Sequence, residues 1–320
     1  MKYLLTGSSG FIGFHFAKKL LKNKNNIVYG LDSLNKYYSI NLKKKRTSIL
    51  KKNNNFIFLN INLCDYHLTK KKILEIKPDF IIHLAGQPGV IYSFKDPESY
   101  KKNNIIATSN LLKILNFVKI KKFIFSSSSS VYGDQKVFPI KENFKLNPIN
   151  YYAITKLKCE NLIKTKLKKL RIPYIIYRLF TVYGPMGRPD MFIYSAIKKI
   201  KNNKKITLYN NGQSLRDFTY VDDVAKVFFK STATKNSDNS IINICASNPI
   251  KILKITKIIG KILNKKIKIR LKKNRKGEME RTHGSNNILK NNFKIKKFIN
   301  INQGLKNIIY QEKKLKNNNK

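Results

Sequence analysis

A glycine-rich loop lies between an apolar strand and a helix at the start of the sequence. KYLLTG (residues 2–7) predicts a buried strand, and FIGFHFAKKLLKN (11–23) predicts an amphipathic helix. Between them, TGSSGFIG places Gly7, Gly10 and Gly13 in a G-x-x-G-x-x-G pattern. Such glycines permit a tight turn, and the helix N-terminus that follows can face a pyrophosphate. This order of elements favours a dinucleotide-binding α/β fold.

Strands alternate with helices along the chain, most regularly in its first half. Further apolar runs predict strands at 26–33, 55–65, 78–86, 121–128, 173–185, 205–211 and 241–248. Helical patterns cover 99–120, 151–170, 188–203 and 222–233. Apolar strands that alternate with helices predict a doubly wound parallel sheet covered on both faces. A smaller, lysine-rich section follows from about residue 250.

Asp32 lies at the end of the second predicted strand, 19 residues after Gly13. A carboxylate at this place can hold both hydroxyls of an adenosine ribose and repels a 2′-phosphate. A nearby arginine would favour the phosphorylated cofactor, and none is adjacent in the sequence. The sequence therefore predicts NAD rather than NADP.

Tyr152 and Lys156 share one helix face, because they are four residues apart in the segment YYAITK. A phenol has a pKa of about 10 in water. An ammonium group one turn away and a positively charged nicotinamide would both favour the phenolate. We therefore expect Tyr152 to act as a base near neutral pH.

Five consecutive serines, Ser126–Ser130, end the strand predicted at 121–128. The run is either a low-complexity spacer or part of a site. The carboxyl ends of parallel strands face the crevice where ligands bind in open α/β sheets. A hydroxyl there can hydrogen-bond both a sugar hydroxyl and Tyr152. The position of the run therefore favours a site.

Four segments together resemble the extended short-chain dehydrogenase/reductase family, and within it the nucleotide-sugar epimerases. They are TGSSGFIG, SSSSSVYG, the Tyr152-x-x-x-Lys156 pair and RDFTYVDD. GQPGVIYSFKDPESY and RLFTVYGPMGRPDM are similar to segments of UDP-glucuronate 4-epimerases. The resemblance extends to about residue 250. It implies a Rossmann-type NAD domain at 1–180 with a returning segment at about 215–247, and a smaller substrate-binding portion at 181–214 and 248–320.

The resemblance also implies a set of site residues, and none of them is expected to bind a metal. Ser128, Tyr152 and Lys156 would form the catalytic trio. NAD contacts would come from Gly7, Gly10, Phe11, Ile12, Gly13, Asp32, Asn35, Asn62, Leu63, Leu84, Ala85, Gly86, Gln87, Asn104, Tyr152 and Lys156. Substrate contacts would come from Ser128, Ser129, Ser130, Thr181, Arg188, Arg216, Arg275 and Glu278, with Arg216 on the diphosphate and Thr181 and Arg188 on the sugar.

The reaction that the resemblance implies is a 4-epimerisation. Tyr152 removes the proton from O4 of the sugar, the C4 hydride passes to NAD, and the hydride returns to the other face after the 4-keto sugar has turned. Related dehydratases have Asp-Glu before Val-Tyr-Gly, and related decarboxylases have a Glu. Here Ser129 and Ser130 occupy these positions and supply no carboxyl acid. We therefore expect conversion of UDP-glucuronate to UDP-galacturonate, which would suit polysaccharide synthesis.

Several positions depart from the family pattern. Ile91 replaces a common arginine, and a cation lost near an anionic substrate leaves a UDP-glucose or UDP-N-acetylglucosamine 4-epimerase open. Asn62 replaces an aspartate that would bind the adenine amino group, although an amide oxygen can also accept that bond. A further alternative, from another class, is a non-catalytic basic Rossmann-fold protein that binds RNA. Intact Tyr152 and Lys156 disfavour it.

The net charge of +49 comes from 66 basic and 17 acidic residues. Lys, Asn and Ile crowd many surface-like segments, as a strongly biased composition would produce. Only eight of the basic residues are Arg, which nucleic-acid sites favour for bidentate contacts. We therefore do not expect nucleic acid as a partner.

The remaining features concern the compartment and the assembly. Cys64, Cys159 and Cys245 stand far apart, which favours a reducing compartment over a disulfide framework or a zinc site. No signal peptide and no run of 18 apolar residues is visible, so we expect a cytoplasmic protein without a membrane partner. In the family, the helices at 98–118 and 151–170 would pair across a two-fold axis, which implies a homodimer.

Overall fold

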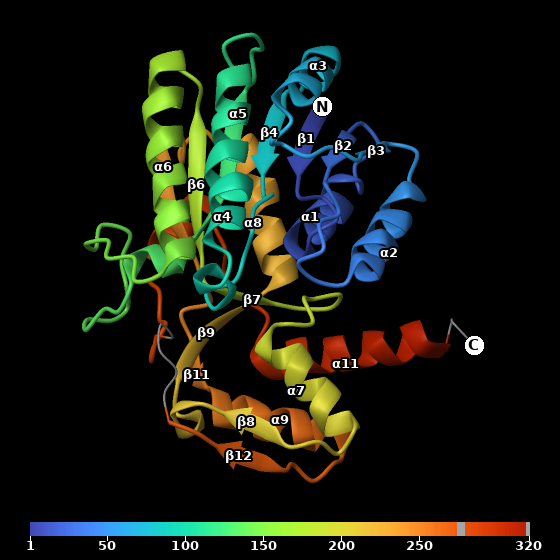
Figure 1. Cartoon of the computed structure of the whole chain (residues 1–320), viewed down its shortest axis with the longest axis vertical. Helices are drawn as coiled ribbons and strands as arrows, with labels where there is room; N and C mark the ends of the chain where they lie inside the picture. Colours follow the sequence, from blue (N-terminus) through green and yellow to red (C-terminus); the bar gives the residue numbers. More distant parts are fainter. Residues whose placement is uncertain (274–278, 318–320) are drawn as a thin grey trace.

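Seven parallel strands form the central sheet of the computed structural model, which describes residues 1–273 and 279–317. The sheet order is β10-β6-β5-β4-β1-β2-β3 (Figure 1). The strands are β1 (Lys2–Thr6), β2 (Ile27–Leu31), β3 (Phe56–Leu59), β4 (Phe80–His83), β5 (Lys122–Ser128), β6 (Tyr174–Leu179) and β10 (Ser240–Ile244). The order reverses at β1, and ligands bind at the carboxyl ends of strands beside such a reversal. The predicted doubly wound sheet is confirmed.

Both faces of the sheet are buried by helices. Successive strand residues point to opposite faces, so Tyr3 and Leu5 of β1 join one buried cluster and Leu4 joins the other. The first cluster is covered by α1 (Phe11–Leu20), α2 (Ile40–Lys51), α8 (Val221–Ala233) and α10 (Asn287–Phe293). The second is covered by α3 (Tyr66–Ile76), α5 (Ala107–Ile114) and α6 (Tyr151–Leu170). This explains why the strands are almost continuously apolar.

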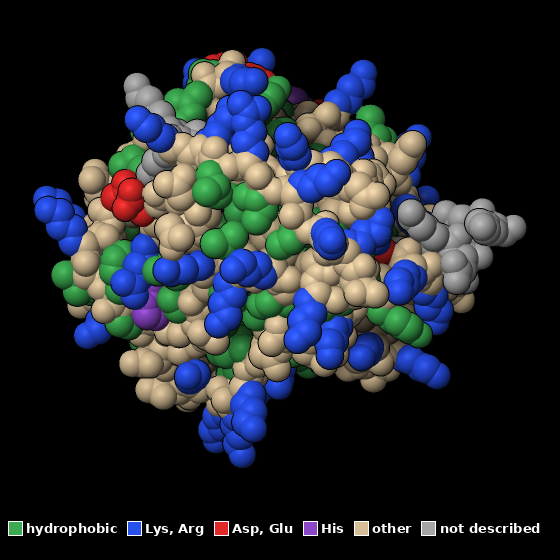
Figure 2. Space-filling model, turned by 90° about the horizontal axis from the view of Figure 1, so that it is seen from below, with side chains coloured by type: hydrophobic (Ala, Val, Ile, Leu, Met, Phe, Trp, Pro, Cys, Tyr) green, Lys and Arg blue, Asp and Glu red, His purple; other side chains and the backbone are tan. Residues whose placement is uncertain are grey.

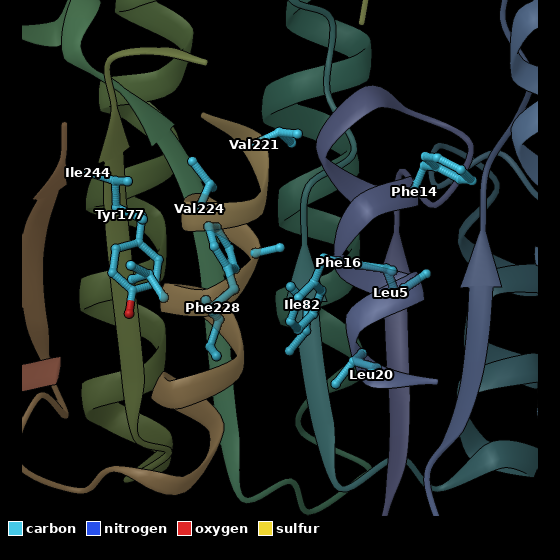
Figure 3. Close-up of a cluster of buried hydrophobic side chains, with 14 of the residues drawn as sticks. Leu5, Phe14, Phe16, Leu20, Ile82, Tyr177, Val221, Val224, Phe228 and Ile244 are labelled. Carbon is cyan, nitrogen blue, oxygen red and sulfur yellow. The ribbon is translucent and has the colours of Figure 1, made fainter. Parts of the chain in front are cut away.

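Aromatic side chains fill the first cluster between the sheet and the helices α1 and α8. The rings of Phe16 and Phe228 have centroids 5.7 Å apart, and Tyr177 of β6 lies 4.8 Å from Phe228 (Figure 3). All three side chains are fully buried. Burial of each phenylalanine side chain stabilises the fold by about 1.5–3 kcal/mol. The packing thereby fixes α1, and with it the glycine loop that precedes this helix.

A smaller unit lies beyond the carboxyl edge of the central sheet (Figure 1). It has a three-stranded sheet, β11-β9-β7, and a two-stranded sheet, β12-β8, with its own buried cluster. Its elements are β7 (Thr181–Tyr183), α7 (Phe192–Lys201), β8 (Ile206–Leu208), β9 (Leu215–Tyr220), β11 (Pro249–Lys251), α9 (Ile252–Leu263), β12 (Ile269–Leu271) and α11 (Ile301–Asn317). β9 thus lies outside the central sheet, whereas α8 and β10 return to it. The proposed domain boundaries stay a prediction.

Two predicted elements are broken in the structure. The strand predicted at 173–185 divides at Phe180, because β6 ends there and β7 enters the three-stranded sheet. The helix predicted at 99–120 becomes α4 (Pro97–Tyr100), a π-helical segment (Lys101–Ile106) and α5. Short 3₁₀ segments lie at Tyr92–Phe94, Ser129–Tyr132 and Asn210–Gly212. The helices α2, α3, α9, α10 and α11 are absent from the sequence prediction.

None of the helices within the described residues is long and apolar enough to span a membrane.

Candidate active site

A cavity of about 450 Å³ lies at the carboxyl ends of β1, β4 and β5 and extends to the smaller unit. It brings together most of the predicted site residues. Those that line it are Gly7, Gly10, Phe11, Ile12, Gly13, Asp32, Asn35, Asn62, Leu63, Leu84, Ala85, Gly86, Gln87, Ser128, Ser129, Ser130, Tyr152, Lys156, Thr181, Arg188 and Arg216. Arg275 and Glu278 lie outside the described residues. The individual roles of these residues stay predictions.

The glycine loop leaves room for a ligand because its backbone packs closely on itself and on the residues just after β4. Gly7 has φ +73°, and a Cβ on it would lie 2.7 Å from the Ala85 nitrogen. A Cβ on Gly13 would lie 2.1 Å from the Gly7 oxygen. Helix α1 begins just after Gly10, with no side chain capping its first N–H groups. These groups fit the pyrophosphate of a dinucleotide.

Asp32 directly follows β2 and lines the cavity near the glycine loop. Its Oδ2 accepts a hydrogen bond from the Ser9 N–H at 3.1 Å, and its Oδ1 accepts one from the Leu34 N–H at 2.8 Å. Burial raises the pKa of this carboxyl, while these backbone groups and the charges of Lys43 and Arg46 lower it. Each carboxylate oxygen keeps a lone pair for a ribose hydroxyl.

Two cations near Asp32 were not expected from the sequence. Lys43 lines the cavity and donates to both the backbone and the side-chain oxygen of Asn35, at 2.7 and 2.6 Å. Arg46 is fully buried and donates to the carbonyl oxygens of Ser9 and Met186. It is absent from the cavity wall, so it does not offer a site for a 2′-phosphate. In the sequence, the only feature that draws attention to Arg46 is the scarcity of arginine in this chain.

The five serines are ordered parts of the sheet and its cavity. Ser126–Ser130 all line the cavity, and Ser127 and Ser128 still pair in register with β6. The Ser128 Oγ accepts from the Ser130 N–H at 3.2 Å and donates to the Ser130 Oγ at 3.1 Å. β5 ends at Ser128 and a 3₁₀ segment follows. A low-complexity spacer is thereby excluded.

Tyr152 and Lys156 project from α6 into the serine end of the cavity. Burial lowers the pKa of Lys156 to about 8, and its Nζ lies 4.1 Å from the centroid of the Phe125 ring. Burial raises the pKa of Tyr152, against the hydrogen bond with Ser128 and the charge of Arg188, which lower it. The net direction is upward, because desolvation of the phenolate outweighs the favourable groups. The role of Tyr152 as a base, for which we also expect the charge of a bound nicotinamide, stays a prediction.

Asn104 does not line the cavity, contrary to its predicted role as a direct contact. It is buried behind the loop that follows β4. Its Oδ1 accepts from the Gln87 N–H at 2.6 Å, and its Nδ2 donates to the Gln87 oxygen and to Thr155 Oγ1. The π-helical turn, a feature often found at functional sites, carries it there. Asn104 thus joins the loop after β4 to the helix α6.

Arg188 and Arg216 lie where the main cavity meets a second cavity of about 290 Å³. The Arg188 Nε and Nη2 donate to the two Asp190 oxygens at 3.1 and 2.5 Å. The Arg216 Nη1 donates to the carbonyl oxygens of Leu215 and Glu280. Both guanidinium groups are therefore oriented by neighbours at the junction of the two cavities.

Comparisons with known proteins agree with this geometry. Residues 3–245 match the model of the NAD dependent epimerase/dehydratase family. The chain belongs to this family. The predicted family, the Rossmann-type fold and the NAD cofactor are thereby confirmed. We call the end of the cavity beside the glycine loop and Asp32 the cofactor end, and its contacts with NAD stay a prediction.

Individual relatives cover most or nearly all of the chain. A UDP-glucuronate 4-epimerase of Thermodesulfobacterium geofontis is 38% identical over 83% of this chain and 82% of its own. The crystal structure of UDP-glucuronic acid 4-epimerase from Bacillus cereus in complex with UDP-glucuronic acid and NAD is 34% identical, with a TM-score of 0.93 over 98% of this chain and 100% of that one. UDP-glucose 4-epimerase of Thermotoga maritima with UDP-glucose is 26% identical, with a TM-score of 0.90 over 98% and 99%.

Replacing Asp32 tests the cofactor end. Asp32→Ala should raise the Kd for NAD by about ten- to a hundredfold, because hydrogen bonds to a charged acceptor are lost. The preference for NAD over NADP should shrink with it. Titration calorimetry of the cofactor-free protein measures both affinities. Asp134→Ala, at an exposed aspartate away from the cavity, should change neither, and equal Kd values for wild type and Asp32→Ala would contradict the assignment.

Proposed function

We propose that this enzyme is a UDP-glucuronate 4-epimerase, which interconverts UDP-glucuronate and UDP-galacturonate. The observation that carries the proposal is the chemistry of the cavity wall beside Tyr152. Among the described residues that line the cavity, Asp32 alone carries a carboxylate, and it lies at the cofactor end. Ser129 and Ser130 present hydroxyls where elimination of water would need a carboxyl acid.

Tyr152 is placed to take the proton from the 4-hydroxyl of the sugar. NAD held at the cofactor end would supply the acceptor for the C4 hydride and the donor for its return. Ser128 hydrogen-bonds the tyrosine and opposes the rise in its pKa that burial causes. Lys156 is cationic below its pKa of about 8 and adds a positive field inside a buried site. Removal of a hydride and its return leave no net redox change.

The carboxylate of the substrate can be lost as CO₂ during the reaction, and the serine end of the cavity can prevent this loss. A 4-keto group makes the sugar acid a β-keto acid, which readily loses CO₂. Hydroxyls of Ser129, Ser130 and Thr181 line this part of the cavity and can hold the carboxylate out of the alignment that loss requires. Arg188 lies beside them as a cation, with its fork fixed by Asp190.

The second cavity suits the nucleotide end of the substrate. Phe192, Leu208 and Tyr209 give it largely apolar walls of the kind on which a base and ribose can pack. Arg188 and Arg216 stand between it and the catalytic cavity. A diphosphate that bridges the two cavities would pass these guanidinium groups, which match phosphate oxygens well. This arrangement supports a nucleoside-diphosphate sugar as the substrate.

One observation favours a second candidate substrate. Ile91 lines the cavity, and its apolar side chain offers no charge to a sugar acid. A UDP-glucose or UDP-N-acetylglucosamine 4-epimerase therefore remains the rival proposal. The RNA-binding alternative has less support, because lysines spread over the face seen in Figure 2 without gathering into one groove. The family membership also favours an enzyme.

We further propose a cytoplasmic homodimer that supplies UDP-galacturonate for polysaccharide synthesis. The helices α5 and α6 lie side by side (Figure 1). Ile106, just before α5, and Leu162 of α6 are each 37% exposed although apolar. Such side chains suit burial against the same helices of a second copy. The free state of Cys64, Cys159 and Cys245 fits a reducing compartment.

Product analysis tests the proposed substrate. The protein with NAD is incubated separately with UDP-glucuronate, UDP-glucose and UDP-N-acetylglucosamine, and the product sugars are separated. UDP-glucuronate should give an equilibrium mixture with UDP-galacturonate. Tyr152→Phe should lower kcat at least a hundredfold, about the value of a general base, whereas Tyr151→Phe, beside it but outside the cavity wall, should not. Conversion of a neutral sugar alone would overturn the choice of substrate.

Removing Arg188 tests the protection of the carboxylate. Arg188→Ala should release CO₂ and a UDP-pentose beside the epimer, because the keto intermediate is held less firmly. Chromatography of the nucleotide sugars measures the ratio of pentose to epimer. Arg171→Ala, at an exposed position after α6, serves as the control and should yield the epimer alone. Purely epimerised product from Arg188→Ala would show that this arginine does not protect the carboxylate.

A further inference from the structure

A buried acid lies beneath the serine end of β5, outside the cavity wall. Glu160 of α6 is 0% exposed and is absent from the residues that line the cavity. Its Oε1 accepts from the Ser127 Oγ at 2.5 Å and from the Arg178 Nε at 3.1 Å. Its Oε2 accepts from the Arg178 Nη2 at 2.8 Å. The bidentate pairing keeps this carboxylate charged inside the protein.

Arg178 is itself held from several sides, so the pair is rigid. Its side chain is almost fully buried. Its Nη1 donates to the Glu142 carbonyl oxygen at 3.1 Å, and its guanidinium lies 4.8 Å from the centroid of the Tyr132 ring. The Tyr132 hydroxyl donates to Asn243 Oδ1 at 2.7 Å. Glu160 therefore anchors the helix α6 to β5 and β6 at one point.

Glu160 is also the ionised neighbour of Lys156, which lies one helical turn earlier. The titratable groups that face Lys156 among the described residues are Tyr152, Cys159 and Glu160 of α6 and His83 of β4. Burial lowers the pKa of His83 to about 3, so its ring is neutral. Burial raises the pKa of the Cys159 thiol, so it is neutral as well. Among these groups, the carboxylate of Glu160 therefore supplies the negative charge that faces the Lys156 ammonium.

We propose that Glu160 is a positioning residue of the active site, which acts through its hydrogen bond to Ser127 and through the negative charge beside Lys156. Ser127 precedes Ser128 on β5, and Ser128 hydrogen-bonds Tyr152 of α6. Because Glu160 belongs to the same helix as Tyr152, its bond to Ser127 fixes the end of β5 against α6 and thereby holds Ser128 within reach of Tyr152. The charge of Glu160 offsets the loss of hydration at Lys156, so the lysine stays protonated to a higher pH.

The pH dependence of catalysis separates this role from a purely structural one. The inference rests on the proposed function for its assay, in which kcat/KM is measured on UDP-glucuronate across neutral and alkaline pH. The wild type should lose activity as Lys156 deprotonates near its pKa of about 8. Glu160→Gln should move this fall to lower pH by about one unit. Glu142→Gln, at a carboxylate that also neighbours Arg178, should leave it in place.

Two further variants separate the charge from the hydrogen bond. Ser127→Ala removes the bond and keeps both charges, so it should lower kcat about tenfold without moving the alkaline fall. Glu160→Gln combined with Arg178→Met removes both buried charges, which avoids an unpaired guanidinium in the core. This double variant should also lose activity at a lower pH than the wild type. An alkaline fall that stays in place in both Glu160 variants, or full activity of Ser127→Ala, would overturn the proposal.

A readout without substrate keeps this inference distinct from the proposed function. The rate at which an amine reagent labels Lys156 at different pH, followed for its peptide by mass spectrometry, reports the titration of that lysine. Glu160→Gln should shift the labelling curve to lower pH, and Glu142→Gln should not. An unmoved curve would overturn the inference even if the enzyme epimerises. Absence of turnover by the wild type on UDP-sugars, with the shift present, would overturn only the proposed function.

Discussion

The close approach of the glycine loop to the end of β4 is the contact on which the site depends. A side chain on Gly7 would meet the Ala85 backbone, and one on Gly13 would meet the Gly7 oxygen. Because the two loops touch, the carboxyl ends of β1 and β4 close one end of the cavity, and the N-terminus of α1 faces into it. β5 pairs with β4 in the same sheet, so its serines reach the same edge. The glycine-loop end and the serine end of the cavity are therefore fixed by one sheet.

Much of this arrangement follows from local sequence patterns. Strand and helix periodicity, the glycine spacing and the four-residue separation of Tyr152 and Lys156 are properties of short segments. The fold realises them except where the elements predicted at 99–120 and 173–185 are broken. The serine run could be placed at a strand's end for the same reason. Its assignment to a site depended on its position in a parallel sheet, because the composition of the run alone is equally typical of a spacer.

The contacts that the sequence did not reveal join separate elements of the fold. Lys43 reaches Asn35 and the cavity. Asn104, predicted to contact NAD directly, reaches Gln87 through a π-helical turn that no periodicity predicts. Glu160 meets Arg178 across the interface of α6 and β6. The division of the strand at Phe180 also depends on a partner, β9, which lies far along the chain. Such pairings are decided by the fold as a whole, so propensity and spacing do not reveal them.

Hydride removal from C4 and its return to the same carbon, with the carboxylate retained, is the central claim about the chemistry. UDP-glucuronate deuterated at C4 tests it most directly when the reaction runs in ordinary water. The UDP-galacturonate formed should keep the deuterium at C4, because the hydride stays within the closed site. Loss of the deuterium to solvent, or its appearance in a product without the carboxylate, would contradict the claim.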